Sequence, residues 1–335
     1  MTYNSISFKY INIMKLLFFL MLLLLISCNS NQERLCIIDS SVKTLTDSTL
    51  LGDLRQLQIY NDTLYMLDEV DGRIIKLDTG FRAGSVIDFS GLDHTGSSFD
   101  PIGIYVDADS IYMMDANVRG IRSLSLKCKH GPITELIGAT GTRFFIHQNK
   151  FYVSHITEQN CIIVVPEKAA LKDTNVVFTG KNFQFTTAKE NLNRNNRYLL
   201  CGKKHYYAIS DNQPIIEKYE LETNKLLYSF DFSDVPMIKS NIHFIRSKVL
   251  DDNSYYVMIE DAYMYGDAIY LLCATLGNNY ERNTIIKVEL EPNMHVTGVY
   301  RLPEISYTSF CADGSYIYAF SKTNNTLGRF KLNGN

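Results

Sequence analysis

The chain has 335 residues, enough for one large domain or two ordinary ones. Hydrophobic residues make up 46% and charged residues 21%, a globular balance that excludes disorder, collagen and coiled coil as descriptions of the whole. A net charge of −3 provides no basic field for nucleic acid. The 22 tyrosines and 18 phenylalanines favour pleated, half-buried surfaces, so the composition favours β-structure.

The first segment in chain order has the pattern of an export signal. Residues 16–26, LLFFLMLLLLI, are apolar without a break, but they are too few to span a bilayer, which takes about 20 residues. Lys15 precedes this run and the small residue Ser27 follows it, which is typical of a secretory signal. Met14 is a better start for such a signal than Met1.

The end of this segment resembles a bacterial lipobox. Its residues are Leu25-Ile26-Ser27-Cys28, and in a lipobox the cysteine is acylated and becomes the first residue of the mature chain. Several acyl chains hold a protein to a membrane far better than one does. We therefore expect residues 1–27 to be a lipoprotein signal peptide, Cys28 to carry the lipid and residues 28–34 to form a polar tether. The alternative is a plain secretory signal with a chance cysteine.

The remaining cysteines are scattered singly along the chain. Most lie in apolar, strand-like runs, where cysteine acts as a small buried hydrophobe, so we favour free thiols over a disulfide framework. Cys128 and His130 have no companion pair of ligands, which argues against a zinc site. The six cysteines are Cys36, Cys128, Cys161, Cys201, Cys273 and Cys311.

One strand unit recurs six times after the tether. In each copy a polar turn residue precedes an apolar pair that ends in tyrosine, and more apolar residues follow. Intervals of 40–63 residues between the tyrosines are too long for a helical hairpin repeat and suit a four-stranded blade. The repeated tyrosines are Tyr65, Tyr112, Tyr152, Tyr207, Tyr270 and Tyr318.

The surroundings of these tyrosines predict the architecture. A strand-like run precedes each copy and two follow it, except that the sixth copy reaches Asn335 before a fourth strand. The unassigned run 35–42 is the obvious donor, because it would close a ring and leave no open sheet edge. We predict one domain over residues 35–335, an all-β, six-bladed β-propeller closed by an N-terminal strand that completes the last blade. The segment 232–262 fits this pattern least, and its run 254–262 could be an extra strand or a misplaced blade edge.

The first two units also resemble a known family. LYMLDEVDGRIIKLD, at 64–78, and the equivalent aspartates Asp68 and Asp115 resemble the repeats of six-bladed β-propeller lipoproteins of Gram-negative bacteria, described as TolB-like or NHL-like. Together with the lipobox, this resemblance implies a lipid-anchored protein of the bacterial envelope, at the outer membrane, facing the periplasm or the surface. It does not imply an activity.

Common catalytic spacings such as G-x-S-x-G and H-E-x-x-H are absent from the sequence. Three residues beyond the repeated tyrosines lie Asp68, Asp115 and His155, at the ends of predicted second strands. They could bind a divalent cation, as in propeller lactonases. The alternative is that the two aspartates cap hairpin turns by accepting hydrogen bonds from backbone N–H groups.

Arginines are the second set of candidate residues. Six of them fall in or beside predicted hairpins and blade junctions, and their planar guanidinium groups suit carboxylates or phosphates. We predict that Arg119, Arg143 and Arg197 contribute to one concave face that binds an anionic ligand. Solvated loop charge is the alternative. The six arginines are Arg73, Arg119, Arg122, Arg143, Arg194 and Arg197, and Arg73, His94 and Asp100 are further candidates at the same mouth.

These patterns favour an envelope-anchored lipoprotein without a cofactor. Its propeller would bind or scaffold a protein, a peptide or a glycan, and its other partner would be the membrane that holds the lipid. The alternative is a propeller hydrolase or lactonase that uses a divalent cation at the channel mouth.

Overall fold

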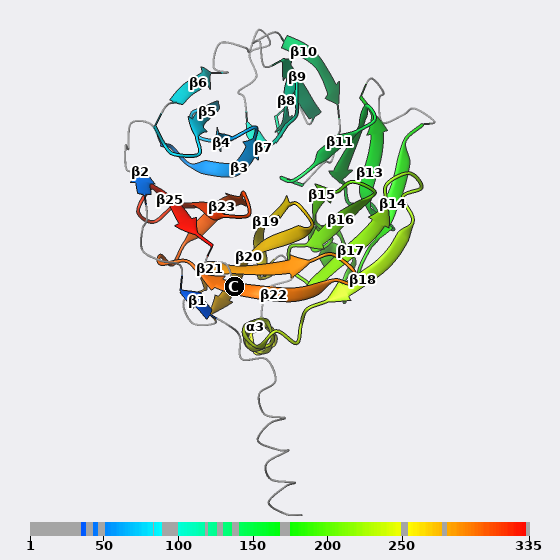
Figure 1. The fold of residues 1–335 in the computed structure, drawn as a ribbon. Coiled ribbons are helices and arrows are strands. Elements are labelled where there is room, and N and C mark those ends of the chain that lie inside the picture. Colours follow the sequence, from blue (N-terminus) through cyan, green and yellow to red (C-terminus); the bar gives the residue numbers. More distant parts are fainter. Residues whose placement is uncertain are drawn as a thin grey trace, which may run out of the picture. The chain divides into compact units, whose positions relative to one another are not determined.

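The computed structural model describes residues 35–37, 43–45, 51–82, 84–88, 100–117, 120–125, 130–135, 141–167, 175–248, 254–276 and 280–332. The chain divides into two units, Met1–Leu35 and Cys36–Asn335, and the second contains the β-structure described below. Its strands form six antiparallel sheets, arranged as the predicted six-bladed β-propeller (Figure 1). The predicted signal segment and Cys28 lie outside the described residues.

The first five blades each contain four consecutive strands. Blade 1 has β3 (Leu54–Tyr60), β4 (Thr63–Asp68), β5 (Arg73–Asp78) and β6 (Gly84–Asp88). Blade 2 has β7 (Pro101–Val106), β8 (Ser110–Asp115), β9 (Gly120–Ser125) and β10 (His130–Glu135). Blade 3 has β11 (Phe145–His147), β12 (Lys150–Ser154), β13 (Asn160–Pro166) and β14 (Val177–Lys181). Blade 4 has β15 (Arg197–Cys201), β16 (His205–Ser210), β17 (Ile215–Glu220) and β18 (Leu226–Asp231). Blade 5 has β19 (Ile259–Tyr265), β20 (Ala268–Leu276), β21 (Glu281–Glu289) and β22 (His295–Arg301).

The last blade is completed from the other end of the chain. It contains β23 (Tyr307–Ala312), β24 (Tyr316–Ser321) and β25 (Thr326–Lys331), and β2 (Lys43–Leu45) pairs with β25 as the outer strand. The strand that closes the ring therefore begins at Lys43, just after the predicted donor, 35–42. β1 (Leu35–Ile37) instead borders β22 as a fifth strand of that sheet. An outer strand pairs through backbone groups, so a short polar segment can serve where an apolar run was expected.

The repeated tyrosine unit is the second strand of each blade. These strands are buried almost along their whole length, as in β4, β8, β16 and β24, because sheets on both sides cover them. All six repeated tyrosines are buried. Among the described residues, Cys161, Cys201, Cys273 and Cys311 are free thiols, which confirms the prediction for these four.

The first strand of each blade faces the propeller axis, where most neighbouring first strands contact one another. Between blades 1 and 2 the contact includes a polar link. The Gln56 side chain donates to the Ile104 carbonyl at 2.8 Å and accepts from its N–H at 2.7 Å, as a neighbouring strand would. Gly103 permits a close approach of the chain, since a Cβ there would lie 2.2 Å from the Thr142 carbonyl oxygen.

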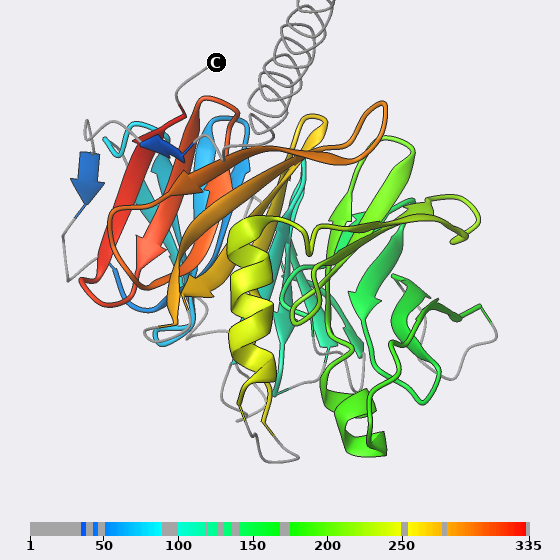
Figure 2. The ribbon, with the colours of Figure 1, turned by 90° about the horizontal axis from the view of Figure 1, so that it is seen from below.

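Within the described residues, two helices interrupt the regular pattern, and both lie in connections between blades (Figure 2). α2 (Ala188–Asn193) starts with a capping box formed by Thr187 and Glu190. α3 (Pro236–Arg246) starts with a proline in its first turn and buries Ile238 and Asn241. It lies within 232–262, and the run 254–262 of that segment, for which an extra strand was one interpretation, leads into β19, the first strand of blade 5. No helix within the described ranges is long and apolar enough to cross a membrane.

Candidate functional site: a pocket beside α3

Most of the predicted site residues lie at one end of the sheets. Antiparallel strands alternate in direction, so the hairpins between second and third strands and the connections between blades share one face, which we call the connection face. The Asp68–Arg73 hairpin, Asp100, Asp115, Arg143, Arg194 and Arg197 belong to it by their places between strands. His94 and Arg119 lie outside the described residues.

Arg143 is buried among the first strands near the axis. Its Nε and Nη2 donate to the two carboxylate oxygens of Asp261 at 2.7 and 2.6 Å. Its Nη1 donates to the Leu57 carbonyl at 2.9 Å, and Nη2 also donates to the Phe310 carbonyl at 3.0 Å. One side chain from the start of blade 3 therefore joins blades 1, 5 and 6.

Arg197 is also buried. Its Nε donates to Glu217 Oε2 at 3.2 Å, and its guanidinium lies 4.2 Å from the centre of the Phe183 ring. Burial raises the pKa of Glu217, and Arg197 partly opposes this shift. Arg143 and Arg197 are thus enclosed and paired with carboxylates, which does not fit a role as exposed ligands of an anion.

The two candidate aspartates are bound within their own blades. Asp68 accepts from Arg73 Nε at 3.0 Å and from the Asp71 N–H at 3.4 Å. Asp115 accepts from Arg122 Nε at 2.7 Å and from the N–H groups of Asn117 and Asp100 at 3.0 and 3.3 Å. Each aspartate thus accepts hydrogen bonds from backbone N–H groups, as a turn cap does, and also from one arginine side chain. Within the described ranges, no three His, Cys, Asp or Glu side chains gather as a metal site would require, so His155 does not join the two aspartates.

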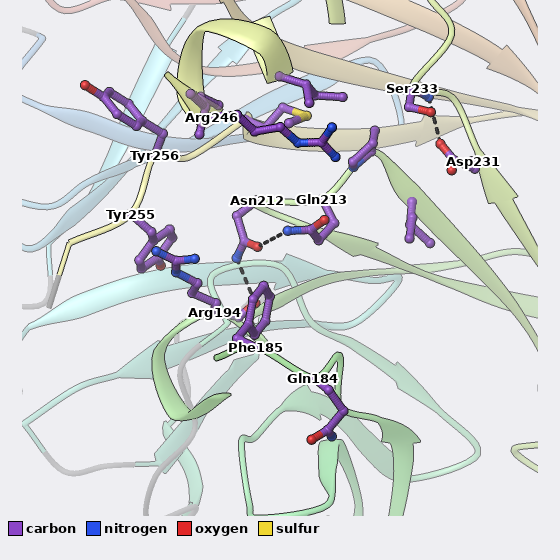
Figure 3. A pocket seen from close by; sticks show the side chains of 15 residues that line it. Gln184, Phe185, Arg194, Asn212, Gln213, Asp231, Ser233, Arg246, Tyr255 and Tyr256 are labelled. Atoms are coloured by element: carbon purple, nitrogen blue, oxygen red, sulfur yellow. Dashed lines mark hydrogen bonds between the residues drawn. The ribbon is translucent and has the colours of Figure 1, made fainter. Parts of the chain in front are cut away.

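A pocket of about 480 Å³ opens on the connection face between blades 4 and 5 (Figure 3). Its volume lies in the usual range for small-molecule sites, about 300–1,000 Å³. Its walls come from the connection that contains α2, the hairpin between β16 and β17, the end of α3, and the segment that leads into β19. We call it the α3 pocket. It is lined by Gln184, Phe185, Arg194, Asn212, Gln213, Pro214, Ile215, Asp231, Ser233, Ile242, Ile245, Arg246, Tyr255, Tyr256 and Met258.

A chain of hydrogen bonds holds one wall of the α3 pocket. The buried Asp211 carboxylate accepts from Asn212 Nδ2 at 2.7 Å and from the Tyr255 hydroxyl at 3.3 Å. Gln213 Nε2 in turn donates to Asn212 Oδ1 at 3.1 Å. Burial raises the pKa of Asp211 to about 6, although Arg197 and these hydrogen bonds partly oppose the shift. Asp211 therefore positions both the aromatic and the amide groups that line the pocket.

Two arginines line the pocket in different states. Arg194 makes an ion pair with Glu190 at 3.0 Å and lies 5.4 and 5.9 Å from the ring centres of Phe185 and Tyr255. Arg246, in the last turn of α3, is exposed and extends from the helix over the pocket (Figure 3). Guanidinium, amide and aromatic groups together can bind a small polar ligand by hydrogen bonds, charge and ring contacts.

The sequence analysis included Arg194 but missed the rest of this pocket. A signal for its helical wall was present. Pro236 is a good first-turn residue, and Ile238, Ile242 and Ile245 recur at helical intervals within 232–262. The turn-forming run Asp211-Asn-Gln-Pro214 also marks a hairpin with polar side chains. Nothing in the spacing indicated that the helix and the hairpin would meet.

Comparisons with known proteins support the fold. No model of a protein family matches the sequence, and neither does any curated protein. Among solved structures, a Bacteroides fragilis protein named as an exported protein superposes with a TM-score of 0.57, at 11% identity, over 90% of this chain and 98% of that one. A catalytically inactive virginiamycin B lyase from Staphylococcus aureus, solved with quinupristin, gives a TM-score of 0.52 at 9% identity, over 87% and 99%. At such identities the likeness shows a shared β-propeller fold alone.

Proposed function

We propose that this chain is a lipid-anchored protein of the bacterial envelope whose propeller is a binding module, with the α3 pocket as its ligand site. The observation that carries the binding role is the pocket itself, which is lined by two arginines, three amide side chains and three aromatic side chains. The lipobox at Leu25–Cys28 and the polar run after it support the anchor.

The position of the α3 pocket supports this role. Regular blade strands bury their side chains against neighbouring sheets, which leaves little surface for recognition. The α3 pocket is built where two connections contain helices and one hairpin is polar. Binding residues are commonly found on such connections, held in place by a rigid scaffold. The metal-dependent hydrolase has no comparable support, because Asp68 and Asp115 are already bonded to Arg73 and Arg122.

Filling the pocket tests the binding role. The full-length protein is purified from its own envelope in detergent, and the small molecules it retains are identified by native mass spectrometry. Gln213→Trp places a large ring on the pocket wall, and we expect it to lose a compound that the wild type retains. Gln159→Trp is the matched control, because Gln159 is an exposed glutamine of the corresponding hairpin in blade 3. Equal retention by Gln213→Trp would contradict the assignment of the pocket.

The anchor is tested separately. Cys28→Ala removes the acylation site, so we expect the protein to move from the membrane fraction to the soluble fraction of the envelope. Cys28→Ser keeps the size of the side chain and is expected to behave in the same way. An unacylated N-terminus at another residue in the wild-type protein, found by mass spectrometry, would contradict this proposal.

A further inference from the structure

Arg246 differs from the other arginines of the described part of the chain. Nine of those have a carboxylate oxygen 2.6–3.5 Å from a guanidinium nitrogen, and Arg329 stacks 3.6 Å from the centre of the Tyr316 ring. Arg246 has neither kind of partner there. The nine paired arginines are Arg55, Arg73, Arg82, Arg122, Arg143, Arg194, Arg197, Arg282 and Arg301.

Among the described residues that line the α3 pocket, Arg246 is the cation whose charge no carboxylate balances. The charge of Arg194 is balanced by Glu190. Asp231 is exposed at the rim and accepts a hydrogen bond from the Ser233 N–H at 2.8 Å, and it makes no ion pair with Arg246. The Asp211 carboxylate is buried behind the wall and holds Asn212 and Tyr255. A guanidinium without a partner, aimed over a cavity, presents a planar set of donors to an anion.

Aromatic residues on the other walls of the α3 pocket suit a ring. Phe185 and Tyr255 contribute rings that flank Arg194, and Tyr256 is fixed by ring contacts with Phe244 and Tyr280, at centroid distances of 5.8 and 5.4 Å. Aromatic faces pack against aromatic ligands and against the apolar faces of sugars. The amide groups of Asn212 and Gln213 add hydrogen-bonding capacity, and their mutual hydrogen bond limits their freedom before a ligand arrives.

We infer that the α3 pocket selects a small ring compound with a carboxylate, which binds Arg246 while its ring lies against the aromatic wall. This inference rests on the proposed function and names the chemistry of its ligand. Two sources share this chemistry: an aromatic acid and a uronic acid of a saccharide. The ring face and the carboxylate are common to both, and the hydroxyl groups of the sugar are what separate them.

Matched acid and ester pairs test the inference. The probes are benzoate with methyl benzoate, and methyl galacturonoside with its methyl ester, and affinities for the full-length protein in detergent are measured by ligand-observed NMR. We expect at least one acid to bind and its neutral ester to bind about tenfold more weakly or not at all, since one hydrogen bond between charged groups is lost. Binding of benzoate alone would identify an aromatic acid, and binding of the galacturonoside alone a saccharide.

The variants assign the effect to one side chain. Arg246→Gln should lower the affinity for the acid to that for the ester and leave the ester unchanged. Lys239→Gln is the control, because it removes the same charge from the same helix at a side chain that is 73% exposed and lies outside the pocket. Acid and ester of equal affinity, an acid that binds Arg246→Gln as it binds the wild type, or no binding of either acid would overturn the inference. If Gln213→Trp still loses the retained compound in those cases, the proposed binding function stands without this ligand class.

Discussion

Two arginines of this propeller show how position decides what a charged side chain does. Arg143, near the axis, donates hydrogen bonds to Asp261 and to carbonyl groups of two other blades. Arg246, at the end of α3, reaches over a pocket without a carboxylate partner in the described part of the chain. The first lies among strands that must pack on all sides, and the second lies on an inserted connection. The regular ring encloses the first arginine, and the inserted connection leaves the second exposed.

The largest expected effect on stability comes from replacing Arg143, the arginine near the axis. Arg143→Met leaves the buried Asp261 carboxylate without its positively charged partner, so we expect the free energy of unfolding to fall by about 3–5 kcal/mol. Urea unfolding at neutral pH measures the change. Arg143→Met combined with Asp261→Asn should recover part of the loss, because no buried charge remains. A single variant as stable as the wild type would show that Arg143 does not join the blades as described.

The pH dependence of stability tests whether Asp211 is buried in the wall of the α3 pocket. The Asp211 carboxyl has a pKa raised by burial from 3.8 to about 6, so its contribution to stability is fully present below pH 3.8 and is lost as the pH rises through about 6. A shift of about two pKa units corresponds to about 3 kcal/mol between the two ends of this range. Asp211→Asn should remove this dependence.

The measurement is the unfolding free energy of the wild type and of Asp211→Asn at several pH values from 4 to 7. The difference, wild type minus variant, should fall as the pH rises. A constant difference would mean that the carboxyl of Asp211 is not buried as the structure has it.

The attachment of α3 should be weaker than that of the strands around the axis. Ile238, a residue of α3, is completely buried, and Ile238→Val removes one methylene group at a cost of about 1 kcal/mol. Hydrogen exchange should then quicken in α3 while amide protection in β3 and β19 stays unchanged. Equal loss of protection in all three elements would show that α3 unfolds only with the whole propeller.

The smallest expected effect on stability belongs to Arg246. Since the side chain is exposed and unpaired in the described structure, Arg246→Gln should change the unfolding free energy by less than about 0.5 kcal/mol. The same urea titration as for Arg143→Met provides the direct contrast. A large loss of stability would mean that Arg246 has a structural partner and that the two arginines do not differ in role.

The success of the sequence analysis depended on periodicity. The strand-like runs that precede Tyr65, Tyr112 and Tyr318 in the sequence lie at 54–60, 101–107 and 307–313. They agree with β3, β7 and β23 to within one residue, because the repeated unit is a local pattern. The closing strand was predicted from the missing fourth strand of blade 6, but its bounds were wrong. A strand at an outer edge has no strong side-chain signature, since its backbone makes the essential contacts.

Side-chain function was harder to predict than the fold. Arg143, Arg197 and Arg246 are the same residue type, all near predicted strand ends or connections, and only the first two are buried. Whether a carboxylate meets a guanidinium depends on residues far along the chain: Asp261 lies 118 residues from Arg143. No local sequence pattern predicts a contact over that separation along the chain.

By itself, the sequence of this protein determined the number of blades, the place of the repeated tyrosines and the deficit that an N-terminal strand fills, because all three follow from hydrophobic alternation over short segments. Tertiary structure alone decided which arginines are enclosed at the axis, and where the hairpin of Asp211 meets α3 to form a pocket. Those outcomes depend on how sheets pack around a ring and bring distant side chains into contact. Short segments of sequence do not predict such long-range contacts.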